Sequence, residues 1–173
     1  LRADGPADND PAHVRPIPPP GIEVPADQEE KLQANLAELE KALAALRKRK
    51  DAATLELLPD VVIFQKAVRD ALRYKEFFSP KEIPIAFELL EEGQRRAADL
   101  AEGKSPWASA TGLVVRGYIS KLDGSVQPYG LVIPPSWRPD GGQRWRTDLW
   151  FHGRGETLSE LSFIHQRLSQ QGA

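Results

Sequence analysis

The sequence contains no cysteine and no methionine. The absence of cysteine excludes disulfide bonds and thiolate metal sites, but it leaves the cellular compartment open. No apolar run approaches the roughly 18 residues that a membrane-spanning helix requires, so we expect no membrane span. The formal net charge is −2 and the pI is near 6.0, a balance that creates no overall field to attract nucleic acid or an anionic membrane.

Methionine is missing even at position 1, which indicates a processed product or an arbitrary boundary. The opening residues Leu1-Arg2-Ala3 place a small side chain where a signal peptidase would cut. We therefore expect a periplasmic or secreted protein, with the cytoplasm as the alternative. An arbitrary boundary explains the same opening equally well.

Composition divides the chain into three regions. Residues 1–25 hold seven of the fifteen prolines and predict an extended tail or linker, in which His13 is a solvated side chain. Residues 26–106 carry helical periodicity. Residues 107–173 hold all four tryptophans and are rich in β-branched residues, which favours strands.

The first expected helix runs from a capping box at Asp27 and Glu30 to about Lys50. Its leucines alternate in steps of four and three, which favours packing on the next helix over an intermolecular coiled coil; they are Leu32, Leu36, Leu39, Leu43 and Leu46. The basic run 47–50 would compensate the negative helix end, an interpretation we prefer to a nucleic-acid patch.

A second helix is expected from Pro59-Asp60, and a third after Ser79, with Pro84 delaying its regular part. Gly93 would allow a close crossing of helices, and Gly103 would end the third helix. The charged residues lie mostly on the wet faces of these helices. We therefore expect no catalytic role for them; the alternative is a pair of carboxylates engaged in acid–base chemistry.

The region after residue 106 predicts a β-hairpin that pairs 112–121 with 125–133. Asp123-Gly124 supplies the turn, and Pro128 indicates an edge or a bulge. A third strand is expected over 144–151.

The stretch DLWFHGRGETLSEL, residues 148–161, then joins an apolar run to a helix through a glycine-rich bend. Gly153 and Gly155 permit a sharp turn, and Thr157 with Glu160 has the spacing of a capping box. A helix with Leu161 on its apolar face should follow. Backbone N–H groups at such a bend and helix start suit an anion.

This order of elements resembles the start of an α/β-hydrolase domain of the prolyl-oligopeptidase-like (peptidase S9-related) type found in secreted bacterial hydrolases. The resemblance covers about residues 110–173, through YGLVIPPSW, DLWFHG and the HGRG sequence. It implies an α+β chain in which an N-terminal helical region precedes the first strands of a hydrolase sheet. The preceding helices would be the N-terminal extension that such proteins often carry.

The resemblance also implies an oxyanion hole formed by the backbone N–H groups of Gly153, Arg154 and Gly155. Arg154 stands where glycine is common, so a contact between its side chain and a substrate carboxylate stays open. His152 would position the loop and not act as a general base. His165 would be a packing or surface residue.

A serine hydrolase of this fold also needs a G-x-S-x-G elbow, an acid and a later histidine, and none of these is found here. Ser125, Ser159 and Ser162 do not stand between a strand and a helix. We therefore expect the N-terminal part of an esterase or peptidase that needs the remainder of the hydrolase domain, acts on an ester or peptide substrate and uses no cofactor. The alternative is a non-catalytic interaction module in which HGRG is only a turn.

Overall fold

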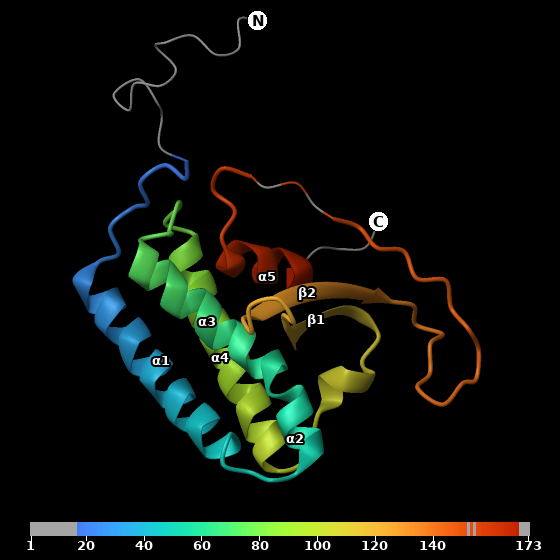
Figure 1. Cartoon of the computed structure of the whole chain (residues 1–173). Coiled ribbons are helices and arrows are strands. Elements are labelled where there is room, and N and C mark those ends of the chain that lie inside the picture. Colours follow the sequence, from blue (N-terminus) through green and yellow to red (C-terminus); the bar gives the residue numbers. More distant parts are fainter. Residues whose placement is uncertain (1–16, 152, 154, 170–173) are drawn as a thin grey trace, which may run out of the picture.

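The computed structural model describes residues 17–151, 153 and 155–169 and has an α+β architecture, as the sequence predicts. Four helices are followed by a 3₁₀ turn, a two-stranded antiparallel sheet and a last helix (Figure 1). The elements are α1 (Ala26–Leu46), α2 (Ala52–Leu57), α3 (Pro59–Tyr74), α4 (Glu82–Ala101), η2 (Pro106–Ser109), β1 (Gly112–Ile119), β2 (Val126–Ile133) and α5 (Glu160–Ser169).

Helices α1, α3 and α4 pack against one another, and no strand occurs between residues 26 and 101. Leu39 and Leu43 of α1 are fully buried in this layer. At Gly93 of α4, an added Cβ would lie 2.8 Å from the Leu39 side chain and 3.0 Å from Phe64. The close crossing expected at Gly93 is therefore present, and it brings α4 against both α1 and α3.

The expected ends of α1 were wrong. The helix starts after Pro25 without a side-chain cap, and Asp27 instead pairs with Lys31 on the surface. The helix also ends at Leu46, so the basic run 47–50 follows it and does not occupy its last turn. Arg49 instead donates to the carbonyl oxygens of Leu100 and Ala101 at the end of α4, at 3.2 and 2.7 Å.

Two further expectations about the helices need correction. The short helix α2 was not predicted; Asp51 caps it by accepting from the Thr54 N–H at 2.9 Å. Pro84 does not delay α4, which starts at Glu82, because a proline in the first turn removes an N–H that has no intrahelical partner. As predicted, α3 starts at Pro59. Gly103 follows the end of α4 with a positive φ, as expected for a glycine that ends a helix.

The hairpin has the predicted pairing, with Val115 opposite Gly130 and Gly117 opposite Pro128. In the turn, the Asp123 carboxylate accepts hydrogen bonds from the N–H and the hydroxyl of Ser125. These bonds, together with a bond from the Ser120 side chain, lower the pKa of Asp123 to about 2. Gly124 has a φ of +72°, which is the reason that glycine suits this position.

The Gly124→Ala variant tests the turn. Its Cβ would meet no atom within 4 Å, so the cost is backbone strain alone. We expect a loss of about 1–2 kcal/mol in the free energy of unfolding, measured in urea. Unchanged stability would show that the turn adopts another conformation.

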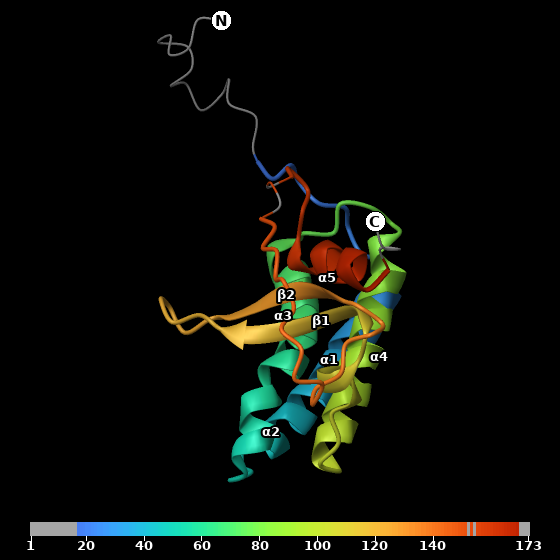
Figure 2. The same ribbon diagram turned by 90° about the vertical axis from the view of Figure 1, so that its right-hand side faces the viewer.

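The hairpin and the helices share one hydrophobic core. Val114 and Val115 of β1 belong to the same buried cluster as Phe64 of α3 and Ile164 of α5. Figure 2 shows the hairpin lying across α3 with α5 beside it. The helical region and the sheet therefore stabilise each other and are not separate layers joined by a linker.

Candidate functional site

The segment before the glycine-rich bend is irregular and exposed, so the strand expected over 144–151 was wrong. Leu149, Trp150 and Phe151 are 81%, 74% and 87% exposed. A strand needs a hydrogen-bonded neighbour, and the only sheet in the described residues consists of β1 and β2. Apolar character predicted a strand here, but the part of the chain that the structure describes offers it no partner strand.

Gly153 and Gly155 lie exposed in the bend, whereas His152 and Arg154 fall outside the described residues. No atom lies within 4 Å of a Cβ added at Gly153, and one added at Gly155 would lie 3.6 Å from the Leu158 Cβ. Both glycines therefore leave space for a group to approach the backbone. Whether their N–H groups converge on one point stays a prediction.

The cap of α5 lies two residues after the expected one. Ser159 and Ser162 form a reciprocal cap, in which the Ser159 Oγ accepts from the Ser162 N–H at 3.3 Å and the Ser162 Oγ accepts from the Ser159 N–H at 3.1 Å. The capping box predicted at Thr157 and Glu160 was thus wrong, since Glu160 instead forms an ion pair with Lys66 of α3. The cap and the ion pair both hold the start of α5, the helix that follows the bend.

The body of α5 lies over the hairpin and the helices. Leu161 and Ile164 are buried, as the apolar pattern predicts. The Arg167 stem passes over Gly130 of β2, where an added Cβ would lie 2.8 Å from its Cδ. His165 is partly exposed, and its Nδ1 lies 3.9 Å from a Glu88 carboxylate oxygen, in keeping with a surface role.

A buried charged cluster, which the sequence analysis missed, joins the helices to β1. Asp60 of α3 is 1% exposed and accepts three hydrogen bonds, from Trp107 Nε1 at 2.9 Å, Arg116 Nε at 2.6 Å and the Gly117 N–H at 2.7 Å. Arg96 of α4 is 2% exposed and donates to the Val115 carbonyl at 2.8 Å. Asp60 stands at a helix start and looked like an ordinary charge there. Arg96, however, falls on the apolar stripe of α4, and this placement was a usable signal.

Aromatic rings and a carboxylate surround the Arg96 guanidinium. It lies 4.8 Å from the Phe64 ring centroid and 5.0 Å from that of Trp107, and its Nε donates to Glu92 at 2.7 Å. Burial lowers the pKa of Arg96 below its ordinary value, although the Glu92 bond acts in the opposite direction. Because the partners of Arg96 and Asp60 are protein groups, the cluster is structural and leaves no position for a substrate.

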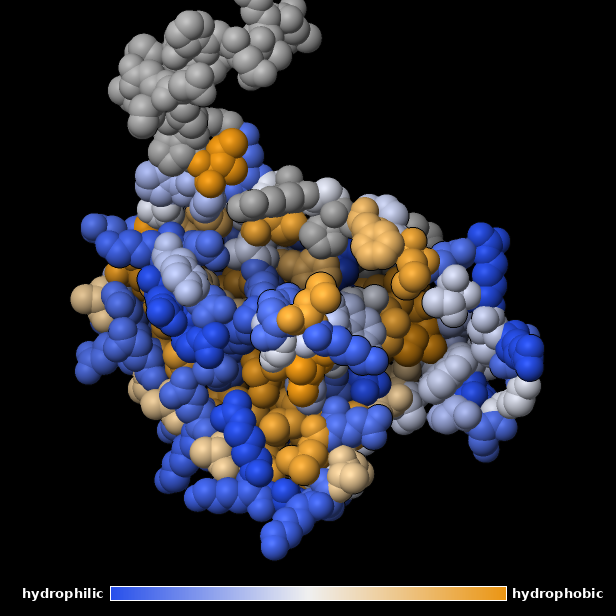
Figure 3. Space-filling model, in the orientation of Figure 1, coloured by the Kyte–Doolittle hydropathy of each residue, from blue (hydrophilic) through white to orange (hydrophobic). Residues whose placement is uncertain are grey.

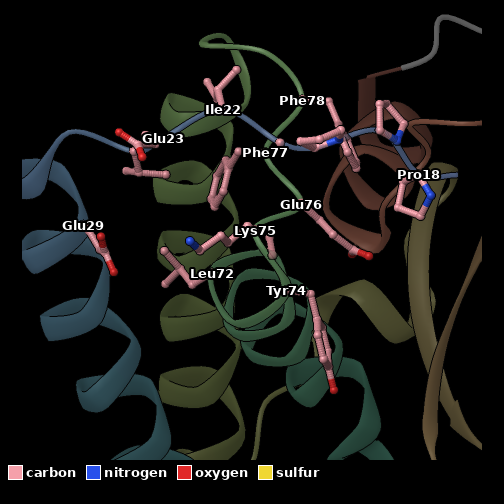
Figure 4. Close-up of a pocket in the computed structure, with 15 residues that line it drawn as sticks. Pro18, Ile22, Glu23, Glu29, Leu72, Tyr74, Lys75, Glu76, Phe77 and Phe78 are labelled. Atoms are coloured by element: carbon pink, nitrogen blue, oxygen red, sulfur yellow. The ribbon is translucent and has the colours of Figure 1, made fainter. Parts of the chain in front are cut away.

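A cavity of about 710 Å³ lies between residues 18–24 and the end of α3 (Figure 4). The Ile22 N–H donates to the Phe77 carbonyl at 2.6 Å, and Gly21 sits so close to the Lys75 carbonyl that no side chain would fit. Glu23 and Glu29 lie on one side of this space, and Phe77 lines it. The cavity thus results from the docking of residues 18–24 on the helical layer.

The described residues hold no group of three or more His, Asp or Glu side chains placed to bind a metal, and no helix there is long and apolar enough to cross a membrane. The three serines considered above have local partners: Ser125 bonds to Asp123, and Ser159 and Ser162 bond to each other. None of these three hydroxyls hydrogen-bonds to a histidine side chain.

No family model, curated protein or solved structure matches this chain.

Proposed function

We propose that this chain is the N-terminal part of a serine hydrolase of the α/β-hydrolase superfamily, prolyl-oligopeptidase-like, that cleaves an ester or peptide bond. It contributes the oxyanion loop at residues 152–155, and the nucleophile, the acid and the catalytic histidine come from the remainder of the gene product. The observation that carries the proposal is the exposed run Leu149–Phe151, which leads directly into the Gly-rich bend. A soluble protein buries such a run, and further strands would bury it here.

The arrangement after the run suits the chemistry of acyl transfer. A tetrahedral intermediate carries negative charge on the former carbonyl oxygen, and fixed N–H donors aimed at it supply about 3–4 kcal/mol of transition-state stabilisation. Fixed donors need a rigid support. The Ser159–Ser162 cap and the Lys66–Glu160 ion pair anchor the helix directly after the bend.

One observation favours the second candidate, a non-catalytic interaction module. The helices and the hairpin already share a single core, which includes Val115 and Ile164. In that case the exposed run Leu149–Phe151 would contact a separate partner, and the bend would be only a turn. The reading frame beyond residue 173 distinguishes the two: a G-x-S-x-G and a late histidine favour the hydrolase, and a stop codon favours the module.

The Gly155→Val variant of the longer gene product tests the oxyanion role. The structure leaves room for the side chain, so we expect little change in the free energy of unfolding. A bulky side chain at an oxyanion donor should lower kcat about 10²–10³-fold. The measurement is kcat on an activated ester together with urea unfolding.

Gly141→Val is the matched control, because Gly141 is an exposed glycine in the same connection between β2 and α5. We expect it to leave kcat within about twofold of the unchanged protein, as for surface substitutions in general. If Gly155→Val lowers stability as much as activity, or lowers neither, the bend is a structural turn.

A further inference from the structure

Residues 18–24 lie as an extended segment on the end of the helical layer. They belong to no helix or strand, and Figure 4 shows them crossing the connection between α3 and α4 on the way to α1. The Ile22 N–H donates to the Phe77 carbonyl at 2.6 Å, and Ile22 and Val24 pack against the core. A main-chain hydrogen bond with apolar residues at alternate positions is a common way in which proteins bind an extended peptide.

The surface under this segment admits only glycine at one position. A Cβ added at Gly21 would collide with the Lys75 carbonyl oxygen and would lie 2.8 Å from that of Phe77. Both oxygens belong to the backbone and cannot turn aside as a flexible side chain can. Gly21 has no positive φ, so the requirement is for space and not for an unusual backbone conformation.

Aromatic side chains stand beside the prolines of the segment. Pro18, Pro19 and Pro20 line the same cavity as a set of side chains from the end of α3 and the connection after it, which we call the α3 corner: Leu72, Tyr74, Lys75, Phe77 and Phe78. Proline-rich segments are extended without internal hydrogen bonds, and aromatic-lined grooves bind them at a low cost in chain entropy. The α3 corner therefore suits a segment with prolines, then glycine, then apolar residues at the first and third positions.

The chain's own segment fills the α3 corner only in part. A cavity of about 710 Å³ stays between the two, and the Tyr74 side chain beside it is 59% exposed. Figure 3 shows hydrophobic atoms at the upper edge of the molecule, where the described part of the chain begins. Proline has no N–H, and within residues 17–151 the Ile22–Phe77 bond is the one backbone hydrogen bond between the segment and the connection.

These sparse contacts make residues 18–24 a displaceable occupant. Phe77 lies under the segment and is 1% exposed, so departure of the segment would uncover apolar surface that another group must cover.

We propose that the α3 corner is a peptide-binding site and that residues 18–24 are its resident occupant. The partner is a protein that presents an extended segment with the pattern of residues 18–24: prolines, then glycine, then apolar residues at the first and third positions. The resident segment closes the site and competes with the partner. The site consists of α3 and the residues around it, so it does not depend on the proposed hydrolase activity.

The structure favours a separate partner over a second copy of the chain. In each copy, Pro25 alone joins the segment to α1, so the segment docks on its own helices at a high effective concentration. A second copy therefore has no free segment of this pattern to offer while its own segment is docked.

Two variants of the 173-residue chain vacate the site by different means. Gly21→Val sets a side chain against the Lys75 carbonyl, and Ile22→Asp places a charge against the apolar core. Gly141→Val is the matched control, because Gly141 is an exposed glycine outside the segment. Circular dichroism first shows which variants fold.

Binding is measured by titrating a synthetic peptide of residues 17–24 into the ¹⁵N-labelled chains and following the Phe77 and Phe78 amides by NMR. A resident that is docked ten times more often than not, at an effective concentration of about 1 mM, corresponds to a Kd of about 0.1 mM. We expect the vacated variants to bind the peptide with about this Kd or tighter. The unchanged chain and Gly141→Val should bind it at least about tenfold more weakly, and a peptide with the Gly21→Val change should bind to none of the chains.

Absence of binding to a folded vacated variant would overturn the proposal. Equal binding by the unchanged chain, or equal binding of the Gly21→Val peptide, would overturn it as well, because the segment would then not be the resident or the site would not require glycine. Dimers of the unchanged chain in sedimentation, held through residues 18–24, would assign the site to a second copy. Failure of both variants to fold would show that the segment is a fixed part of the core and not a displaceable occupant.

Discussion

Replacing Asp60 with alanine should lower the free energy of unfolding by about 3–5 kcal/mol, the range for removing one partner of a buried charged pair. The change leaves three donors without an acceptor, on Trp107, Arg116 and the Gly117 backbone. Arg116 and the neighbouring Arg96 also lose a compensating negative charge. Since small domains have only about 5–15 kcal/mol of stability, we expect a largely unfolded population at moderate urea concentrations.

Asp70→Ala is the control, because Asp70 lies on the same helix and pairs with Arg69 nearer the surface. Exposed ion pairs contribute about 0–1 kcal/mol, so its effect should be small. Urea unfolding followed by tryptophan fluorescence measures both variants, since Trp107 lies in the cluster. Equal effects of the two substitutions would show that Asp60 does not connect the helices to the sheet.

The second large effect concerns activity. The 173-residue chain should not hydrolyse a simple activated ester, whereas the gene product carried to its natural stop should. An oxyanion loop stabilises charge only after a nucleophile has attacked, and Ser125, Ser159 and Ser162 hydrogen-bond to Asp123 or to each other and not to a histidine side chain. We expect the rates of the two products to differ by at least about 10⁴-fold.

The control is the longer product with the serine of its G-x-S-x-G changed to alanine, which should lose the activity while keeping its Tm. If that variant hydrolysed the ester as fast as the unchanged longer product, another group would have to be the nucleophile. Serine-dependent turnover by the short chain would contradict the proposed function, because it requires a complete site within residues 1–173.

Local sequence signals predicted those elements whose stability comes from neighbours in the chain. The apolar periodicity of α1, α3, α4 and α5 and the Asp123-Gly124 turn led to the correct α+β class and to the hairpin. These features depend on side-chain spacing and on the φ preference of glycine, both of which can be read from a short window. The exact helix ends were less accurate: α1 starts after Pro25 and Ser159 caps α5, whereas the local pattern placed the caps at Asp27 and Thr157.

The sequence by itself also determined that residues 149–151 are apolar and precede a glycine-rich bend, but only the tertiary structure decided that they form no strand and stay exposed. A strand exists only where another strand supplies hydrogen bonds, and no local pattern contains that partner. The same reason explains Asp60 and Arg96. Asp60 looked like a charge suited to a helix start, and Arg96 carried only the signal of its place on the apolar stripe of α4. The packing of α3 and α4 against β1 gives both their buried partners, and bonds to the β1 backbone offset the cost of burial.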